Sequence, residues 1–285
     1  MDTANAASEP SPKPRRTLSN LTQRILSSVV LLPVLAAVLW LGNWWIVGTV
    51  LLVVLLSLYE LYGLFKSGGY RPHPVGYLVA VALVVVAVVR SYGGPDLLAP
   101  VVTLAIILTL IVELAAPDLT GALPNWLSTF AGSLYVPWLL VHFILLRSLP
   151  QGAAWIAVAL AITFASDTGA YFVGRRLGRR RMAPVISPNK SWEGAVGGLV
   201  FGMLGSMLAV ELLHLPISLP IAGMLGVLGS LAGQAGDLVE SLIKRQVGVK
   251  DSGKLIPGHG GLLDRVDSLL FTVPVLYYLV VWLTH

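Results

Sequence analysis

Two aspartates near the end of the chain have a spacing suited to metal and phosphate chemistry. Asp264 and Asp267 are three positions apart at the start of an expected helix, so their carboxylates share a face. Proteins usually hold Mg²⁺ with one or two carboxylates and let substrate phosphates complete the coordination. The His/Cys patterns typical of zinc sites are absent from the sequence. The spacing therefore predicts a magnesium-dependent site that handles phosphates.

A polar, glycine-rich segment, residues 249–261, leads into these aspartates. Glycines leave the backbone mobile and exposed, which suits its N–H groups to contact phosphate oxygens. The segment supplies the candidate substrate-binding residues Lys250, Asp251, His259 and Gly260. Two of them have a second interpretation, because a lone histidine is ordinarily structural and Asp251 could instead order the loop.

A further group of polar residues follows the small residues 233–236 on an expected helix. Its members are three and four positions apart and so share one helix face: Asp237, Glu240, Ser241 and Lys244. The small residues allow another helix or a ligand to approach closely. A purely solvated face is the alternative, and it is disfavoured because this face continues from a buried span.

Residues 187–194 lie at the start of another apolar helix. Ser187 or Asn189 is expected to cap that helix, with Glu193 in its first turn near the positive end of the helix dipole. Capping does not account for Lys190. A lysine beside the free N–H groups of a helix start favours phosphate binding, whereas the alternative is capping combined with anchoring at the membrane edge.

Asp167 lies in the middle of an apolar helix that is followed by an arginine cluster at 175–181. An ionisable side chain in such a helix is costly in a membrane and usually faces a water-filled cavity or a partner. Asp167 is thus a candidate for the site, with a structural hydrogen bond to a neighbouring helix as the alternative. The arginines are better explained as determinants of membrane orientation.

The elements that must position these residues are expected to be membrane-spanning helices. Hydrophobic residues make up 56% of the chain and charged residues 12%, with a mean hydropathy of +0.81, whereas soluble domains carry about 25% charged residues. A helix of about 20 apolar residues spans a bilayer. Runs of this character are 22–41, 45–65, 74–90, 98–115, 127–147, 152–174, 194–213, 218–236 and 262–283. The predicted fold is an all-α polytopic bundle of about nine transmembrane helices.

The basic residues predict the orientation of this bundle. With nine spans and an internal N-terminus, all of the 19 Lys and Arg residues except Arg90 and Arg147 fall on the inner side, as the positive-inside rule requires. We therefore expect an N-in, C-out protein of the inner membrane whose site faces the cytoplasm. Nucleic acid is disfavoured as a partner, because the basic residues flank membrane spans.

The chain changes in character near residue 150, after which most acidic residues occur. We expect a disordered cytoplasmic tail at 1–18, an N-terminal transmembrane region at 19–150 and a catalytic transmembrane region at 151–285. In the N-terminal region, Glu60 is expected to snorkel or to pair with Lys66, although their sequence spacing disfavours direct contact on a helix. The chain contains no cysteine, which excludes disulfides and thiol chemistry.

Three elements of the C-terminal half resemble motifs of the phosphatidate cytidylyltransferases, the bacterial CDP-diacylglycerol synthases. Residues 241–267 contain S-x-x-K-R, four residues, K-D-x-G and then P-x-H-G-G-x-x-D-R-x-D, where x is any residue. Residues 187–194 match S-P-x-K-[ST]-x-E-G, and residues 167–174 match D-x-x-x-Y-F-x-G. The resemblance covers residues 160–285, whereas the N-terminal half is similar only as a generic helical membrane region.

This resemblance implies that CTP and phosphatidic acid react to give CDP-diacylglycerol and pyrophosphate with Mg²⁺, with K⁺ as a candidate second cation. It makes Asp264 the first choice as metal ligand, followed by Asp237 and then Asp267. The implied catalytic residues are Asp264, Asp237, Lys244 and Arg265. The implied substrate-binding residues are Ser187, Asn189, Lys190, Arg245, Lys250, Asp251, His259, Gly260 and Asp167. A homodimer is the expected assembly.

Other functions remain as alternatives at this stage. A related enzyme could use the same CTP chemistry on another lipid phosphate. CDP-alcohol phosphotransferases require D-G-x-x-A-R, which the sequence lacks, and the order of the H-G-G-x-x-D-R-x-D motif does not suggest a polyprenyl-phosphate sugar transferase. A transporter or channel would place its carboxylates near the middle of the bilayer, whereas an enzyme would gather them on the cytoplasmic side.

Overall fold

A computed structural model describes residues 33, 37–115, 119–253, 255–256 and 260–284. The expected tail at 1–18, most of the expected span at 22–41 and the candidate residue His259 lie outside the described residues.

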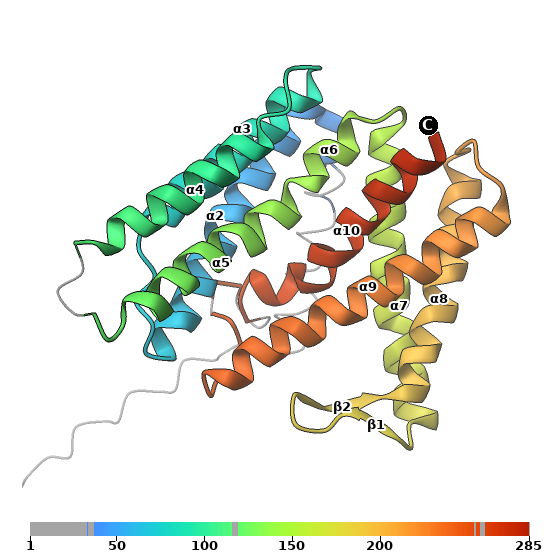
Figure 1. Cartoon of the computed structure of the whole chain (residues 1–285). Helices are drawn as coiled ribbons and strands as arrows, with labels where there is room; N and C mark the ends of the chain where they lie inside the picture. Colours follow the sequence, from blue (N-terminus) through green and yellow to red (C-terminus); the bar gives the residue numbers. More distant parts are fainter. Residues whose placement is uncertain (1–32, 34–36, 116–118, 254, 257–259, 285) are drawn as a thin grey trace, which may run out of the picture.

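The described residues form α-helices and one small β-hairpin (Figure 1). The helices that precede the hairpin are α2 (Asn43–Ser67), α3 (Val75–Ser91), α4 (Leu98–Glu113), α5 (Ala122–Leu140), α6 (His142–Ser148) and α7 (Gly152–Leu177). The hairpin consists of β1 (Arg181–Ala183) and β2 (Ser187–Ser191). After it come α8 (Trp192–Leu212), α9 (Leu219–Gln246) and α10 (Leu263–Thr284).

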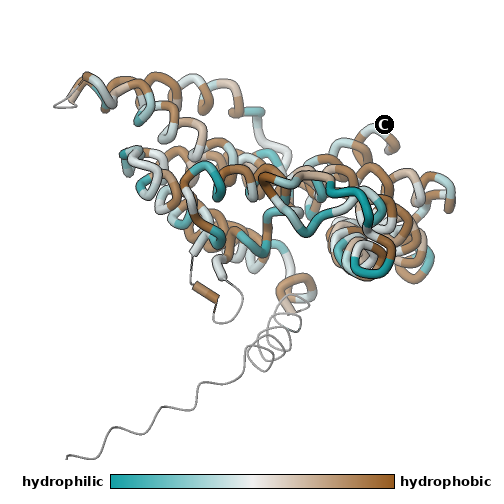
Figure 2. The backbone as a smooth tube through the Cα atoms, turned by 90° about the horizontal axis from the view of Figure 1, so that it is seen from below, coloured by the Kyte–Doolittle hydropathy of each residue, from teal (hydrophilic) through white to brown (hydrophobic). Residues whose placement is uncertain are grey.

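The helices confirm that this is a multi-pass, all-α membrane protein. Six described segments are long and apolar enough to cross a bilayer: α2, α5 together with α6, α7, α8, α9 and α10. Helices α3 and α4 are apolar but shorter. Figure 2 shows hydrophobic residues along most of the helices and several hydrophilic segments at the end that faces the viewer. The largest departure from the expected boundaries is α9, which continues past residue 236 to Gln246.

Residues with positive φ lie in the short turns that precede several of the helices. Gly42 precedes α2 with φ of 105°, Gln151 precedes α7 with φ of 54°, and His214 lies between α8 and α9 with φ of 50°. These left-handed conformations reverse the chain within a few residues. Consecutive long helices therefore run antiparallel, which brings the end of α7, the end of α9 and the start of α10 to the same end of the bundle (Figure 1).

Small residues allow the helices of the C-terminal half to pack closely. Helix α7 packs along α8, α8 along α9, and α9 along α10. At Gly236 of α9, a Cβ atom would lie 2.5 Å from the carbonyl oxygen of Asp267 on α10, closer than real Cβ contacts. The expectation that residues 233–236 admit a neighbouring helix is confirmed, because only a small residue fits there.

The start of α8 differs from the sequence prediction. Residues 187–191 form strand β2, paired antiparallel with β1, so neither Ser187 nor Asn189 caps the helix. The cap is Ser191, whose extended backbone (φ −124°, ψ 155°) precedes the helix and whose Oγ accepts from the Gly194 amide at 3.1 Å. Glu193 lies in the first turn as expected. Its carboxylate accepts from the backbone amides of Arg179 and Arg180, which ties the chain before β1 to α8.

Candidate active site

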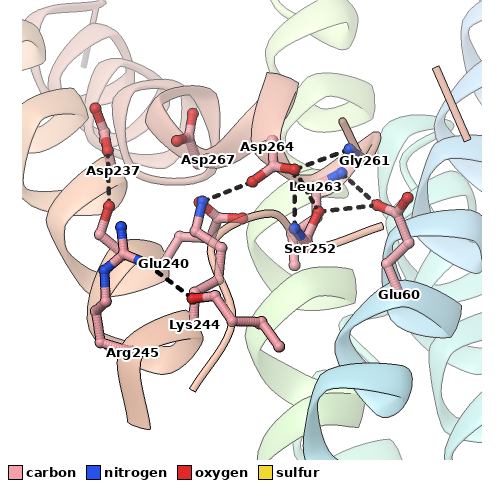
Figure 3. Close-up of polar contacts among 12 residues, drawn as sticks. Glu60, Asp237, Glu240, Lys244, Arg245, Ser252, Gly261, Leu263, Asp264 and Asp267 are labelled. Atoms are coloured by element: carbon pink, nitrogen blue, oxygen red, sulfur yellow. Dashed lines mark hydrogen bonds and ion pairs between the residues drawn. The ribbon is translucent and has the colours of Figure 1, made fainter. Parts of the chain in front are cut away.

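Candidate residues from several segments meet at one end of the bundle, and Figure 3 shows five of them: Asp237, Lys244, Arg245, Asp264 and Asp267. They come from the last turns of α9, the first turns of α10, the end of β2 and the segment between α9 and α10. This is the arrangement that the sequence predicts from separate motifs. The hydrophobic sides of α9 and α10 continue from this end into the bundle core, where Leu225 and Leu270 are fully buried.

Lys190 is the residue through which the hairpin reaches the site. Its Nζ lies 2.7 Å from Oδ2 of Asp237 on α9. The second carboxylate oxygen of Asp237 accepts from Ser241 Oγ, one helical turn later, at 3.3 Å. The side chains of Lys190 and Asp237 are 24% and 31% exposed, respectively. Lys190 is therefore held beside the site by a carboxylate, with its side chain partly exposed and its Nζ buried.

Lys244 connects α9 to α10 inside the bundle. Its Nζ donates to Glu240 Oε2 at 2.5 Å and to Asp264 Oδ1 at 2.6 Å. Glu240 is fully buried and Lys244 is 8% exposed. The face shared by Asp237, Glu240, Ser241 and Lys244 is thus confirmed, but its last two charged members form a buried ion pair. Such a pair is sensitive to the loss of either partner, because an unpaired charge remains in the interior.

Asp264 uses its second carboxylate oxygen to order the segment before α10. Oδ2 accepts from the amide of Ser252 at 2.9 Å, the hydroxyl of Ser252 at 2.9 Å and the amide of Gly261 at 2.8 Å. With Lys244 on Oδ1, the carboxylate has four donors, which is about its full accepting capacity. In this arrangement Asp264 is a structural centre of the site, and it would have to release a donor before it could bind a cation.

Asp237 and Asp267 belong to a group of three carboxylates that interact with one another. The carboxylates of Asp167, Asp237 and Asp267 lie near enough to one another to interact electrostatically, and Lys190 and Arg265 act on Asp167 as well. Asp267 accepts from the amide of Ser268 at 2.6 Å. Like charges brought together in this way are stabilised by a bound cation. Among the described residues, no three His, Cys, Asp or Glu side chains form a metal cage by themselves.

Other candidate residues lie around this centre. Arg245 donates from Nε to the carbonyl of Ile186 at 3.2 Å and from a terminal nitrogen to the carbonyl of Val249 at 3.0 Å, so it fastens the hairpin to the end of α9. Asn189, Lys250, Asp251 and Arg265 are exposed, whereas Ser187 is half-buried in β2. Gly260 has φ of +81°, and a Cβ there would meet Asp264 Oδ2 at 2.8 Å.

Glu60 of α2 is a site residue that sequence reasoning missed. It neither snorkels nor pairs with Lys66: its side chain is buried, with 3% of the residue exposed. Oε2 accepts from the Leu263 amide at 2.7 Å and from Ser252 Oγ at 3.3 Å. The available signal was a carboxylate in an apolar helix of the N-terminal region, which in a membrane protein indicates a polar partner. The sequence did not reveal that the partners, Ser252 and Leu263, lie 192 and 203 residues further along the chain.

Comparisons with known proteins identify the family of this chain. The sequence profile of the cytidylyltransferase family matches residues 22–283. The phosphatidate cytidylyltransferase of Synechocystis sp. is 32% identical over 92% of this chain and 97% of its own length. That of Brucella suis is 34% identical over 91% of this chain and 93% of its own length. The phosphatidate cytidylyltransferase of Bacillus subtilis is 44% identical, but the match spans 52% of this chain and about half of that protein, 55%. The family profile covers both the helical bundle and all parts of the site, and this chain belongs to the cytidylyltransferase family.

Proposed function

We propose that this protein transfers the cytidylyl group of CTP to phosphatidic acid, giving CDP-diacylglycerol and pyrophosphate for phospholipid biosynthesis. The observation that carries the proposal is the juxtaposition of Lys190, Asp237 and Asp267 at the polar end of an apolar helix bundle. This arrangement suits a reaction between a water-soluble nucleotide and a membrane lipid. Relatives named phosphatidate cytidylyltransferase, aligned over nearly the whole chain, support the choice of substrates.

The proposed reaction is a displacement at phosphorus. An oxygen of the phosphatidate phosphate attacks the α-phosphorus of CTP, the bond from that phosphorus to the bridging oxygen breaks, and pyrophosphate leaves with the bonding electrons. A phosphate monoester is already largely ionised near neutral pH, so the attacking oxygen needs no strong general base. The principal demand on the protein is to bring two anions together and to stabilise the added negative charge.

Each cationic residue is assigned a separate role in bringing the two anions together. Lys190 lies beside the Asp237 carboxylate with its side chain partly exposed, so we assign it to a phosphate of CTP or of the lipid. Arg265 acts electrostatically on the same region from the first turn of α10. Lys244 is held between two carboxylates, so its contribution is to fix Asp264 and through it the segment before α10.

Asp237 and Asp267 are the residues that we expect to hold Mg²⁺, with Asp167 beside them. A bound Mg²⁺ would supply Lewis-acid polarisation of the phosphates. This order differs from the one implied by the motifs, which placed Asp264 first, because Asp264 already accepts four hydrogen bonds. A second, monovalent cation such as K⁺ and a homodimeric assembly remain expectations.

The site is proposed to face the cytoplasm, where CTP is available, in a nine-span, N-in, C-out protein of the inner membrane. Basic residues in the last turns of α2, α7 and α9 support this orientation, because these turns lie at the end that carries the site: Lys66, Arg175, Arg176, Lys244 and Arg245. We propose that residues 151–285 form the catalytic region and that Glu60, from the N-terminal region, also contributes to the site.

The direct test is release of pyrophosphate by the purified protein in liposomes that contain phosphatidic acid, with CTP and Mg²⁺ supplied. Release is expected to require both substrates, and liposomes with diacylglycerol in place of phosphatidic acid should give none. Asp237→Asn should reduce the rate about 100-fold or more, since it removes a carboxylate that we expect to hold the Mg²⁺ acting on the phosphates. Asp96→Asn is the matched control, because Asp96 is exposed and pairs with Arg90 away from the site.

Two outcomes contradict the proposal. Absence of release by folded wild-type protein would reject the activity, and equal release from another lipid phosphate would reject phosphatidic acid as the preferred acceptor.

A further inference from the structure

We propose that Glu60 of α2 is a positioning residue for the active site, holding the start of α10 and the segment around Ser252 in the geometry that the reaction needs. This inference rests on the proposed function. It assigns a catalytic contribution to the N-terminal half of the chain, in which the motifs that resemble the family do not lie.

The first argument is the set of contacts that Glu60 makes. The Leu263 amide, which donates to Oε2 at 2.7 Å, belongs to the first residue of α10. The first amides of a helix lack partners within it, and a carboxylate there also interacts favourably with the helix dipole. Glu60 thus supplies from another helix what an N-cap residue ordinarily supplies from the same one. The next residue of α10 is Asp264.

The second argument is that Glu60 and Asp264 share Ser252. The Ser252 hydroxyl lies 3.3 Å from Glu60 Oε2 and 2.9 Å from Asp264 Oδ2. Figure 3 shows Glu60 reaching this group from the side opposite Lys244. The chain of contacts continues from Asp264 through Lys244 to Glu240. A displacement of Glu60 would therefore also move Asp264 and the turn of α10 that carries Asp267.

The third argument is steric. A Cβ at Gly261 would lie 2.6 Å from Glu60 Oε2, and a Cβ at Gly253 would also collide with the Glu60 carboxylate. The Glu60 carboxylate therefore fits between Gly253 and Gly261 only because neither residue has a Cβ atom. No described residue donates to Oε1 of Glu60, although that atom is buried. The enclosure of a carboxylate with one oxygen unpaired is unfavourable for stability alone, which indicates that its position serves the site.

The first experiment measures the order of the segment without relying on activity. Because the chain has no cysteine, a nitroxide can be attached at Asp251→Cys, next to Ser252, or at Val185→Cys on the hairpin, where the side chain is 87% exposed. Glu60→Ala should increase the mobility of the label at 251 and leave that at 185 unchanged. Identical spectra at 251 with and without Glu60 would overturn the proposal.

The second experiment measures kinetics in the chain without labels. Glu60→Ala should lower kcat about 100-fold, the loss expected when a catalytic group moves by about 1 Å, with little change in the KM for CTP. Glu60→Gln should retain intermediate activity, because its amide oxygen still accepts from Leu263. Glu211→Ala, at an exposed carboxylate of α8, should behave as wild type. Equal loss in Glu60→Ala and Glu211→Ala, or an unchanged kcat in Glu60→Ala, would reject the role.

A double-mutant cycle provides the control for misfolding. Gly253→Ala should reduce kcat in the wild-type background but add little to Glu60→Ala, since the atoms that its Cβ would meet are then absent. Additive losses would show that the two residues act independently and would contradict the inference. An inactive wild-type protein would reject the proposed function instead, while the spectra of the labelled proteins would still test the position of Glu60.

Discussion

The ammonium group of Lys190 lies 2.7 Å from a carboxylate oxygen of Asp237 and so joins the β-hairpin to the end of α9. Both side chains are partly exposed, so this pair differs from the buried pair of Lys244 and Glu240. A partly exposed ion pair contributes less to stability than a fully buried one, and we expect this pair to open when a ligand offers better partners. Lys190 would then contact a phosphate and Asp237 a cation, which makes the pair a resting arrangement of the site.

Lys190→Ala is expected to reduce kcat/KM for CTP about 100-fold, the loss typical of removing one preorganised group that stabilises transition-state charge. The unfolding temperature should change little, because the Lys190–Asp237 pair is partly exposed. Steady-state pyrophosphate release and thermal unfolding in detergent measure the two effects. Lys66→Ala, an exposed lysine at the end of α2, is the control. A large loss of stability with unaltered turnover would show that Lys190 is structural.

Lys244→Met is expected to destabilise the protein by about 3–5 kcal/mol, because it leaves the carboxylates of Glu240 and Asp264 in the interior without their cation. The double variant Glu240→Gln with Lys244→Met should recover part of this loss, since one buried charge is removed with its partner. Denaturant unfolding in a defined detergent measures both free energies. If Lys244→Met unfolds like wild type, the buried network is not a source of stability.

Gly236→Ala is expected to separate α9 from α10, because its Cβ would lie 2.5 Å from the carbonyl oxygen of Asp267. The cost of such overpacking is about 1–3 kcal/mol, and activity should fall as well, since the displaced turn carries Asp267. Gly48→Ala in α2 is the matched control, because its Cβ would meet no atom within 4 Å. Thermal unfolding and pyrophosphate release should be altered in the first variant alone.

The orientation can be tested with single cysteines, because the native chain has none. A membrane-impermeant maleimide should label Val185→Cys, on the hairpin, in inverted vesicles. Leu213→Cys lies in the turn between α8 and α9 at the other end of the bundle, so it should be labelled in intact spheroplasts. The reverse pattern would place the active site outside and contradict the N-in, C-out arrangement.

Much of the fold could be predicted from the sequence because the bilayer imposes a simple rule. A long apolar run has to be helical to satisfy its backbone in lipid, so the expected runs from 45 onward coincide with helices α2 to α10. The shared face of Asp237 and Ser241 also followed from helical periodicity, and their hydrogen bond confirms it. The family motifs contain most of the residues gathered at the end of α9 and the start of α10.

Features that depend on contacts between distant segments could not be predicted. The motif around Lys190 includes Ser187 and Asn189, both good capping residues, yet the helix begins later and Ser191 caps it because the preceding residues pair with β1. The saturation of Asp264 by Ser252, Gly261 and Lys244 depends on how the segment before α10 folds back. The position of Glu60 depends on the packing of α2 against α10, which no local pattern encodes.

The location of the site at the end of the helices has a kinetic consequence. In the proposed reaction, CTP diffuses in the three-dimensional aqueous pool, whereas the lipid substrate and product diffuse in the two-dimensional bilayer. The rate should therefore follow the mole fraction of phosphatidic acid in the membrane and not its amount per volume. Adding inert phospholipid or detergent at constant phosphatidic acid should slow the enzyme by surface dilution, whereas the response to CTP should follow its ordinary bulk concentration.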